Sequence, residues 1–531
     1  MQLTLAKSNQ VIFVITKLIT PFFVDLKLSK IIRCISITVL VLLTAAACQQ
    51  QTSDNSLANS SDIASKSVPS NDTRAPYAVG SRTFFIHDDS RPFDSVAGVD
   101  VGIRSLLTEV WYPVEHEAVA GGEYLPATYG DYVFRDKAVH RLMMTQTTFF
   151  HLTPESVIEG VSAADIDAAI AELFDRPRAS YIDAPLAISE KAHPVVVMTH
   201  GDAGSRYNMQ SVCEYLAAHG YVVIAPEHTG NTPFALTIKD PEIDASLAAI
   251  KPLLNADGTY GPLDNYGQTY TPLIRDRSNP QAMVNLDNSL LERVNDLRAV
   301  LSELDSMNLS GPFAKQLNLD KVGLIGRSFG GTTTLAALAL EPRFTAGVAV
   351  VPMVLPDMRK GLPVDILKPD NAESVILSSG EDYTLQTISK PTMLLSGADD
   401  SLIIGVGAAM AKAVGAEPPT LENPLPELRR IYEETSQPVI WGLLKDSNHS
   451  SFGVSGGYWW PEYKASSQQR FFDPEQSFQL VNAETAHQIQ QQKVIQFFDF
   501  TVRGVESAKD ALLQNEFAKH GLLYESRNFT N

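Results

Sequence analysis

The chain has 531 residues, of which 44% are hydrophobic and 19% are charged, as is ordinary for a globular protein. Its formal net charge is −19 and it has no cluster of lysine and arginine. Because binding to nucleic-acid phosphates needs such clusters, the charge argues against a nucleic-acid-binding protein. The same acidity disfavours electrostatic docking on anionic lipid, and we interpret it as a contribution to solubility.

Residues 1–47 have the layout of a secretory signal. Basic residues precede the apolar run 35–47 (ISITVLVLLTAAA), which ends in small residues and is too short for a comfortable transmembrane helix. Cys48 follows directly, so the segment resembles a bacterial lipobox, with Ala45 where leucine is usual. That resemblance implies lipidation of Cys48; the alternatives are simple cleavage or an uncleaved anchor.

Residues 48–75 are rich in serine, asparagine and glutamine, which predicts a disordered tether behind the lipidated cysteine. Gln49 and Gln50 follow Cys48, and by resemblance to sorting rules they favour the outer membrane over the inner one. We therefore expect an exported protein that is lipid-anchored at the bacterial cell envelope, at the outer membrane or in the periplasm.

From residue 76 to residue 531 the sequence predicts one α/β domain. Apolar or β-branched runs predict strands within residues 82–88, 105–115, 193–200, 221–228, 321–326, 346–353, 390–400 and 438–449. Helical periodicity predicts helices at residues 162–175 (capped by Ser162), 209–220, 288–307, 329–341 and 483–504. This alternation indicates a mostly parallel central sheet with helices on both faces, and the less regular stretches near 122–185 and 229–285 are expected to be lid-like insertions.

Residues 326–330 read Gly-Arg-Ser-Phe-Gly, a G-x-S-x-G motif between a predicted strand and a predicted helix. Ser328 must occupy a strained turn that lifts its hydroxyl clear of the backbone, while Gly326 and Gly330 leave room for strand and helix to approach. The helix N-terminus adds a positive dipole beside a developing oxyanion. We predict that Ser328 is the nucleophile of an α/β-hydrolase fold; a purely structural turn is the alternative.

In this fold the triad follows the order serine, acid, histidine, so the base is sought after Ser328. His449 lies in a loop just past the last predicted strand of the alternating series, whereas His487 and His520 fall in helical segments. We therefore predict that His449 is the general base. The alternative is a loop histidine without a role.

The triad acid is sought in the segment KPTMLLSGADDSLI, an apolar strand followed by a glycine turn and two aspartates. Asp400 stands three residues after Gly397, at the usual spacing for this fold, and is predicted to orient the imidazole. Asp399 and Asp357 remain as alternatives.

The oxyanion hole is expected to use the backbone N–H of Phe329, the residue after the nucleophile. A second N–H should come from the loop after strand 193–200, and we choose Asp202, with its carboxylate turned away. His200 is interpreted as a residue that holds this loop rather than as a second base.

Three cysteines occur, and Cys34 and Cys48 fall in the leader. Cys213 is left alone in the predicted domain, on a helix where it is expected to act as a small core residue. No histidine or cysteine grouping has zinc spacing, so we expect no metal, no cofactor and no internal disulfide.

Three segments resemble platelet-activating factor acetylhydrolase and its bacterial relatives, often labelled predicted dienelactone hydrolases. They are residues 199–230 (THGDAGSRYNMQSVCEYLAAHGYVVIAPEHTG), GRSFGG with the following RFTAGVAVVPMVLP, and NHSSF at 448–452. The likeness runs from about the EVWYP strand to the NHSSF loop. It implies a secreted, metal-free, calcium-independent esterase that cleaves short or oxidised acyl esters, including sn-2 acetyl phospholipids.

The sequence departs from this family at two positions. In the acetylhydrolases the catalytic aspartate follows the strand after the nucleophile, where Val351 stands here, so the acid must come from elsewhere. Arg327 replaces the histidine commonly found before the nucleophile. The segment GADDSLI also resembles the acid loop of cutinase-like and polyester-cleaving hydrolases.

The expected function is a serine carboxylic-ester hydrolase that works through an acyl-enzyme, with a small-molecule or lipid ester as substrate and a membrane contact only through the anchor. One alternative is a cutinase-like esterase acting on polyesters or xenobiotics. Another is a surface lipoprotein that binds a ligand without catalysis. The sequence defines neither the acyl and alcohol groups nor the oligomeric state.

Overall fold

The computed structural model describes residues 75–529 except 133–160, 233–238, 244–247, 257, 263–267, 272–278, 371, 381–383, 387, 455–457 and 462–466. The predicted signal segment, the predicted lipidation site Cys48 and the tether before residue 75 lie outside the described residues. The described residues all belong to one compact unit, Val68–Asn531. Within the described ranges, no helix combines the length and apolar character needed to cross a membrane.

In the part of the chain that the structure describes, a sheet of eleven strands runs in the order β13-β10-β9-β8-β7-β5-β6-β2-β1-β4-β3. The strands are β1 (Ala78–Asp88), β2 (Arg104–Val114), β3 (Pro126–Thr128), β4 (Pro177–Ile182), β5 (His193–Thr199), β6 (Val222–Pro226), β7 (Leu317–Arg327), β8 (Phe344–Val350), β9 (Thr392–Gly397), β10 (Val439–Leu444) and β13 (Leu522–Arg527). A separate ribbon pairs β11 (Ser467–Gln469) with β12 (Ser477–Gln479).

The six neighbours from β6 to β10 are all parallel. On one side β2 pairs antiparallel with β6, and β1 pairs antiparallel with β2; on the other side β13 pairs antiparallel with β10. The prediction of a mostly parallel central sheet is confirmed. Since parallel strands end at a common edge, the loops after β5, β7, β9 and β10 meet at one side of the molecule.

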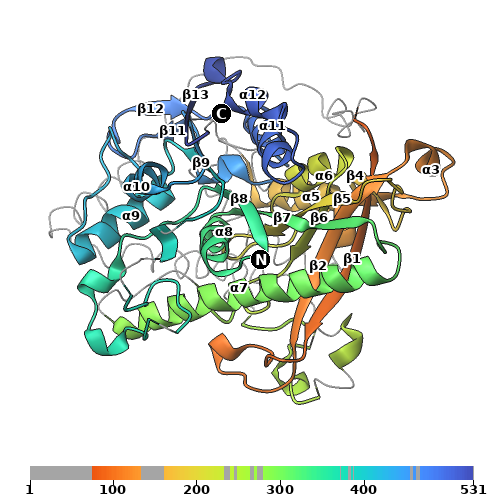
Figure 1. Ribbon diagram of the computed structural model, residues 1–531, viewed down its shortest axis with the longest axis horizontal. Coiled ribbons are helices and arrows are strands. Elements are labelled where there is room, and N and C mark those ends of the chain that lie inside the picture. Colours follow the sequence, from red (N-terminus) through yellow and green to blue (C-terminus); the bar gives the residue numbers. More distant parts are fainter. Residues whose placement is uncertain are drawn as a thin grey trace, which may run out of the picture. The chain divides into compact units, whose positions relative to one another are not determined.

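The helices are α3 (His116–Ala120), α5 (Ala163–Asp175), α6 (Gln210–Ala218), α7 (Pro280–Leu309), α8 (Phe329–Leu340), α9 (Ser401–Val414), α10 (Pro426–Glu434), α11 (Ala483–Thr501) and α12 (Ala508–Leu513). Helices α7 to α10 share one hydrophobic cluster with the sheet, and α5, α6, α11 and α12 share the other (Figure 1). Strand β5 shows why: Val195 and Val197 join the first cluster, whereas Val196 and Met198 join the second. Helices on both faces are thus confirmed.

Two helix starts follow their capping residues. The Ser162 hydroxyl accepts the Asp165 N–H at 3.2 Å, and the Asp165 carboxylate accepts the Ser162 N–H at 2.7 Å, so α5 begins as predicted. Helix α7 begins eight residues before the predicted 288, because Asn279 caps it and Pro280 occupies its first turn.

The two predicted insertions differ in what they contribute. Within 122–185, strands β3 and β4 extend the sheet beyond β1, and α5 packs in the cluster of α6 and α11. The described parts of 229–285 hold short 3₁₀ helices at Pro241–Ile243 and Lys251–Leu253 and a small apolar cluster with Phe93. Their action as lids stays a prediction.

Candidate active site

The turn between β7 and α8 carries Ser328 in an uncommon backbone conformation. Its φ of 59° and ψ of −125° are costly for a residue with a side chain. The Ser328 N–H donates to the Val350 carbonyl at 2.8 Å, which ties the turn to the end of β8. The strained turn that the G-x-S-x-G motif predicts is therefore present.

The glycines around Ser328 stand where no side chain fits. A Cβ on Gly326 would meet the Gly330 backbone, and a Cβ on Gly330 would meet the Thr199 carbonyl. A Cβ on Gly201 would lie 3.1 Å from the Ser328 Cβ. The loop after β5 therefore passes directly beside the nucleophile turn.

Ser328, His449 and Asp400 are brought together from three loops at the carboxyl edge of the sheet. His449 Nε2 lies 2.9 Å from Ser328 Oγ, and His449 Nδ1 lies 2.7 Å from Asp400 Oδ2. Asp400 is 1% exposed and caps α9 by accepting the Ile403 N–H at 3.1 Å. Because the carboxylate accepts from Nδ1–H, Nε2 is free to accept the serine proton.

The other aspartates considered as triad acids have different partners. Asp399 Oδ2 binds Arg470 at 2.5 Å, next to the triad but facing the other way. Asp357 pairs with Arg359 at 2.8 Å and caps a short 3₁₀ helix. The arginine lowers the pKa of Asp357 through its hydrogen bond. Neither carboxylate contacts His449.

The other histidines after Ser328 also have partners away from the nucleophile. His487 lies on α11, where Nδ1 is 2.6 Å from the Ser211 hydroxyl and Nε2 is 3.1 Å from the Gly453 carbonyl. Burial lowers the pKa of His487 to about 4. His520 lies exposed in a 3₁₀ helix near the C-terminus.

The loop after β5 presents Asp202 with its carboxylate occupied. Asp202 Oδ1 accepts from Asn231 Nδ2 at 2.8 Å, and Oδ2 accepts from the Thr271 hydroxyl at 3.3 Å. Burial raises the pKa of this carboxyl. Phe329 is the first residue of α8, so its N–H lacks an intrahelical partner. Phe329 thus follows Ser328 at the start of the helix, and the loop of Asp202 passes beside Ser328 at Gly201. The use of both N–H groups as an oxyanion hole stays a prediction.

His200 uses both ring nitrogens to fix the same loop. Nε2 accepts the His228 N–H at 3.0 Å, and Nδ1 donates to the Gly201 carbonyl at 2.7 Å. Burial lowers the pKa of His200 well below its usual value, so the ring is neutral. This is the loop-holding arrangement that the sequence predicts for His200.

Arg327, which precedes the nucleophile, lies buried behind the triad. Its Nη2 donates to the His449 carbonyl at 2.6 Å, and Nη1 is 3.5 Å from Asn208 Oδ1. Burial lowers the pKa of Arg327 to about 10, an effect that Asp400 opposes. The arginine therefore joins the nucleophile strand to the loop of the base.

Val351 occupies the position that holds the acid in the acetylhydrolases. It is 2% exposed and has a φ of 41°, which is rare for a β-branched residue. Its N–H donates to the Leu395 carbonyl at 2.7 Å, so it closes the edge between β8 and β9.

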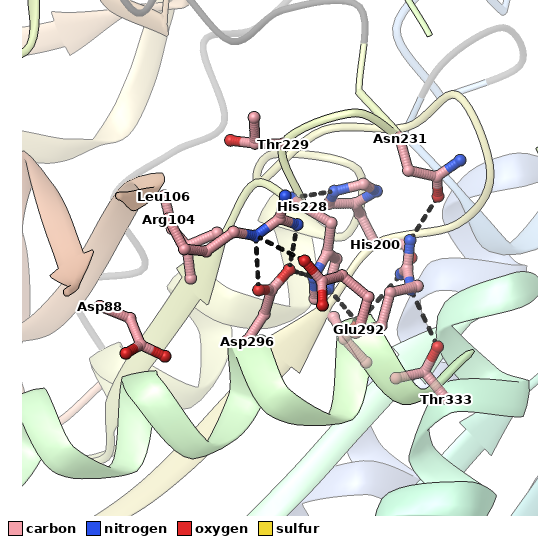
Figure 2. Close-up of polar contacts among 12 residues, drawn as sticks. Asp88, Arg104, Leu106, His200, His228, Thr229, Asn231, Glu292, Asp296 and Thr333 are labelled. Atoms are coloured by element: carbon pink, nitrogen blue, oxygen red, sulfur yellow. Dashed lines mark hydrogen bonds and ion pairs between the residues drawn. The ribbon is translucent and has the colours of Figure 1, made fainter. Parts of the chain in front are cut away.

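A buried network of charges beneath these loops was missed by the sequence analysis. Asp296 of α7 accepts from Arg104 at 2.8 and 2.9 Å and from His228 Nδ1 at 2.9 Å (Figure 2). It also accepts from Arg91 at 2.9 Å. These cations hold the pKa of Asp296 well below its usual range. His228 Nε2 in turn lies 2.8 Å from the Thr199 hydroxyl.

Asp296, His228 and Thr199 have the residue types of a second triad. Thr199 is 0% exposed at the end of β5, and burial lowers the pKa of His228 to about 3. Because all three side chains are fully buried, this arrangement fixes loops and cannot reach a substrate. The sequence offered one signal for this network: two charged residues, Arg293 and Asp296, stand on the buried face of an amphipathic helix. Within the described residues, no cluster of three or more metal-ligating side chains occurs.

Comparisons with known proteins point to the same fold. Residues 176–369 match the family described as platelet-activating factor acetylhydrolase, isoform II. The matched segment includes Ser328 and Asp202 and ends before Asp400 and His449.

Among curated proteins, the platelet-activating factor acetylhydrolases of Canis lupus familiaris and Bos taurus are each 27% identical, over 179 and 176 residues. In both cases the alignment covers 33% of this chain and 38% of the relative, so it spans well under half of the relatives' length. A putative phospholipase A2 of Schizosaccharomyces pombe is 42% identical over 48 residues, 9% of this chain and 11% of that protein.

Among solved structures, a ferulic acid esterase from Streptomyces cinnamoneus superposes with a TM-score of 0.50 over 85% of this chain and 97% of that chain, at 18% identity. At this identity the likeness concerns the fold. The sheet order, the strand–turn–helix at Ser328 and the matched segment agree with one another. The chain therefore has the α/β-hydrolase fold, and its residues 176–369 are similar to the family described as platelet-activating factor acetylhydrolase, isoform II.

Proposed function

We propose that the protein is a serine hydrolase of carboxylic esters that acts through an acyl-enzyme. The observation that carries this proposal is the hydrogen-bonded series from Ser328 Oγ through His449 to Asp400, at 2.9 and 2.7 Å. A serine hydroxyl within reach of an imidazole, itself oriented by a buried carboxylate, is the arrangement that activates a nucleophile.

In the proposed mechanism, Ser328 Oγ attacks the ester carbonyl while His449 Nε2 takes the hydroxyl proton. Asp400 stabilises the imidazolium that forms. The N–H groups of Phe329 and Asp202 stabilise the tetrahedral oxyanion. His449 then protonates the leaving alcohol, and water repeats the same steps on the acyl-enzyme to release the acid.

For the substrate we propose short acyl esters, including sn-2 acetyl phospholipids. The support is the match of residues 176–369 to the acetylhydrolase family, which covers the nucleophile turn and the oxyanion loop. A polyester or xenobiotic ester is the competing substrate class, because the acid comes from Asp400 after β9 and Val351 fills the acetylhydrolase position.

The test is hydrolysis of p-nitrophenyl esters from acetate to palmitate and of a 2-acetyl phospholipid by the purified chain. We expect activity on acetate and butyrate, and its loss in Ser328→Ala. A preference for the phospholipid supports the acetylhydrolase-like substrate; hydrolysis of aromatic or polymeric esters alone supports the competing class. Failure of a fluorophosphonate probe to label Ser328 would instead support a lipoprotein that only binds its ligand.

We also propose that the chain is exported and lipidated at Cys48, a proposal that rests on the sequence pattern at residues 35–48. Metabolic labelling with an alkyne fatty acid tests it. We expect a labelled band that disappears in Cys48→Ser, and a labelled Cys48→Ser band would contradict the assignment.

A further inference from the structure

We propose that Arg293 of α7 is a positioning residue that holds both oxyanion-hole donors of the hydrolase in place and supplies a buried positive charge beside them. The inference rests on the proposed function. Arg293 lies near the middle of α7 and belongs to no motif of the nucleophile or the triad.

The first set of contacts fixes the loop after β5. Arg293 Nη2 donates to the His200 carbonyl and, at 3.1 Å, to the Thr199 hydroxyl. His200 is two residues before Asp202, whose N–H is the second proposed donor. The guanidinium therefore sets the path of the backbone just before the N–H that must face the oxyanion.

The second set reaches Asp202 through one intermediate side chain. Arg293 Nη1 donates to Asn231 Oδ1 at 2.6 Å, and Asn231 Nδ2 donates to Asp202 Oδ1 at 2.8 Å. The loop is thus held both before Asp202, at the backbone, and at the Asp202 carboxylate.

The third set fixes the first turn of α8. Arg293 Nε donates to the Thr333 hydroxyl at 2.9 Å. That hydroxyl donates to the Phe329 carbonyl at 2.8 Å. The guanidinium carbon also lies 4.9 Å from the centre of the Phe329 ring. One side chain therefore contacts the residue of the first donor and the loop of the second.

The charge of Arg293 is not neutralised by a direct ion pair. Its hydrogen-bond partners are two hydroxyls, a carbonyl and an amide, and among the described residues no carboxylate lies within ion-pair distance of it. By contrast, Arg104 binds Asp296 through two hydrogen bonds. Burial lowers the pKa of Arg293 to about 10, so it stays protonated at neutral pH.

A buried cation without a carboxylate costs folding free energy, and it becomes useful when negative charge develops nearby. The tetrahedral intermediate places such a charge between the Phe329 and Asp202 N–H groups. Arg293 should therefore favour the transition state over the bound ester, which predicts an effect on kcat and little on KM.

The experiment compares Arg293→Met, Arg293→Lys and a matched control, Arg298→Met. Arg298 lies on the same helix but is half-buried and paired with Glu341 and Glu373. We expect Arg293→Met to lower kcat by roughly 100- to 1,000-fold, the effect of losing an oxyanion donor, with KM changed less than about threefold. Arg293→Lys keeps the positive charge but loses the guanidinium hydrogen bonds, so its kcat should lie between that of Arg293→Met and that of the wild type. The kcat of Arg298→Met should match that of the wild type.

Thermal denaturation will show whether Arg293→Met folds. If it does not, Thr333→Val is the alternative variant, because it preserves the side-chain volume. It removes the acceptor for Arg293 Nε and should lower kcat several-fold, while the donor left unpaired should lower the melting temperature by a few degrees without unfolding the protein. The rate of fluorophosphonate labelling of Ser328 should fall in parallel in each variant, since that reaction also develops charge in the oxyanion hole.

The outcomes separate this inference from the proposed function. If the wild type cleaves no ester but is labelled, the ester assignment fails and the labelling rates still test Arg293. If folded Arg293→Met and Thr333→Val keep wild-type kcat and labelling rates, the inference is wrong while the hydrolase proposal stands. Absence of both hydrolysis and labelling in the wild type overturns both.

Discussion

Asp399 and Asp400 are adjacent in the chain but contact different residues. Asp400 is buried against His449 Nδ1 at 2.7 Å, whereas Asp399 forms a partly exposed ion pair with Arg470 at 2.5 Å. We expect Asp400→Asn to lower kcat by about 10⁴-fold, because an amide favours the wrong imidazole tautomer. Steady-state kinetics on p-nitrophenyl acetate measures this effect.

Asp399→Asn is the matched control for that prediction. It should leave kcat within a few-fold of wild type, because Asp399 binds Arg470 rather than His449. If Asp399→Asn lowers kcat more than Asp400→Asn does, the triad acid is Asp399. Wild-type activity in both would direct attention to Asp357.

The triad residues were predictable because each has a local sequence signal: a G-x-S-x-G run at Ser328, a loop after a strand at His449, and a glycine turn before Asp400. Arg293 and Asn231 lack such a signal. Their contacts depend on how a long helix lies across the sheet and on the path of the loop after β6, and both are tertiary features.

Among elements, the parallel strands were predictable because they are buried on both faces and therefore read as apolar runs. The edge strands were not. In β13 (Leu522–Arg527) only the first residue is buried, and β4 (Pro177–Ile182) mixes buried and exposed positions inside an insertion. These strands are defined by pairing with β10 and β1, a long-range contact that periodicity does not encode.

The contact between the loop after β5 and the start of α8 gives a prediction at the level of elements. A Cβ on Gly330 would meet the Thr199 carbonyl, which belongs to the backbone and has little room to move. We expect Gly330→Ala to lower the free energy of unfolding by about 1–3 kcal/mol through overpacking. It should also lower kcat roughly tenfold or more by displacing the helix that carries Phe329.

Gly405 of α9 provides the matched control, because the atom nearest to an added Cβ is a Phe471 ring carbon at an ordinary 3.6 Å. Gly405→Ala should therefore raise the free energy of unfolding by about 0.5–1 kcal/mol and leave kcat unchanged. Urea denaturation and steady-state kinetics of both variants make the comparison. If Gly330→Ala is as active and as stable as the wild type, the start of α8 can move away from the loop after β5 without loss of function, and the prediction is wrong.

At the scale of the whole molecule, the acidic net charge of −19 is combined with an interior rich in arginine. Arg104, Arg206, Arg293 and Arg327 are all buried, the first two against carboxylates and the last two chiefly against neutral acceptors. The unpaired cations both adjoin the proposed catalytic residues. Arg293 and Arg327 thus place buried positive charge near the point where the proposed chemistry develops negative charge.

Buried neutral histidines give the molecule a predicted sensitivity to acid. Burial lowers the pKa of His228 to about 3 and of His487 to about 4, and it also lowers that of His200. Each ring stays neutral in the folded protein but gains a proton in the unfolded chain below about pH 6.5. Their stabilisation is therefore complete above pH 6.5 and is lost as the pH falls toward 4.

Glu214 acts in the opposite direction, because burial raises its pKa to about 7 and the folded state favours its protonated form below that pH. The contribution of one histidine is isolated with His487→Gln, which removes a ring that packs against Tyr458 and lies near the Arg327 charge. Between pH 7 and pH 4 the wild type should lose about 3 kcal/mol more unfolding free energy than the variant, because burial lowers the pKa of His487 from 6.5 to about 4. Urea denaturation of both proteins at pH 7, 6, 5 and 4 measures the difference. Parallel losses in the two proteins would mean that His487 is protonated in the folded state, and that water reaches the space between α6 and α11.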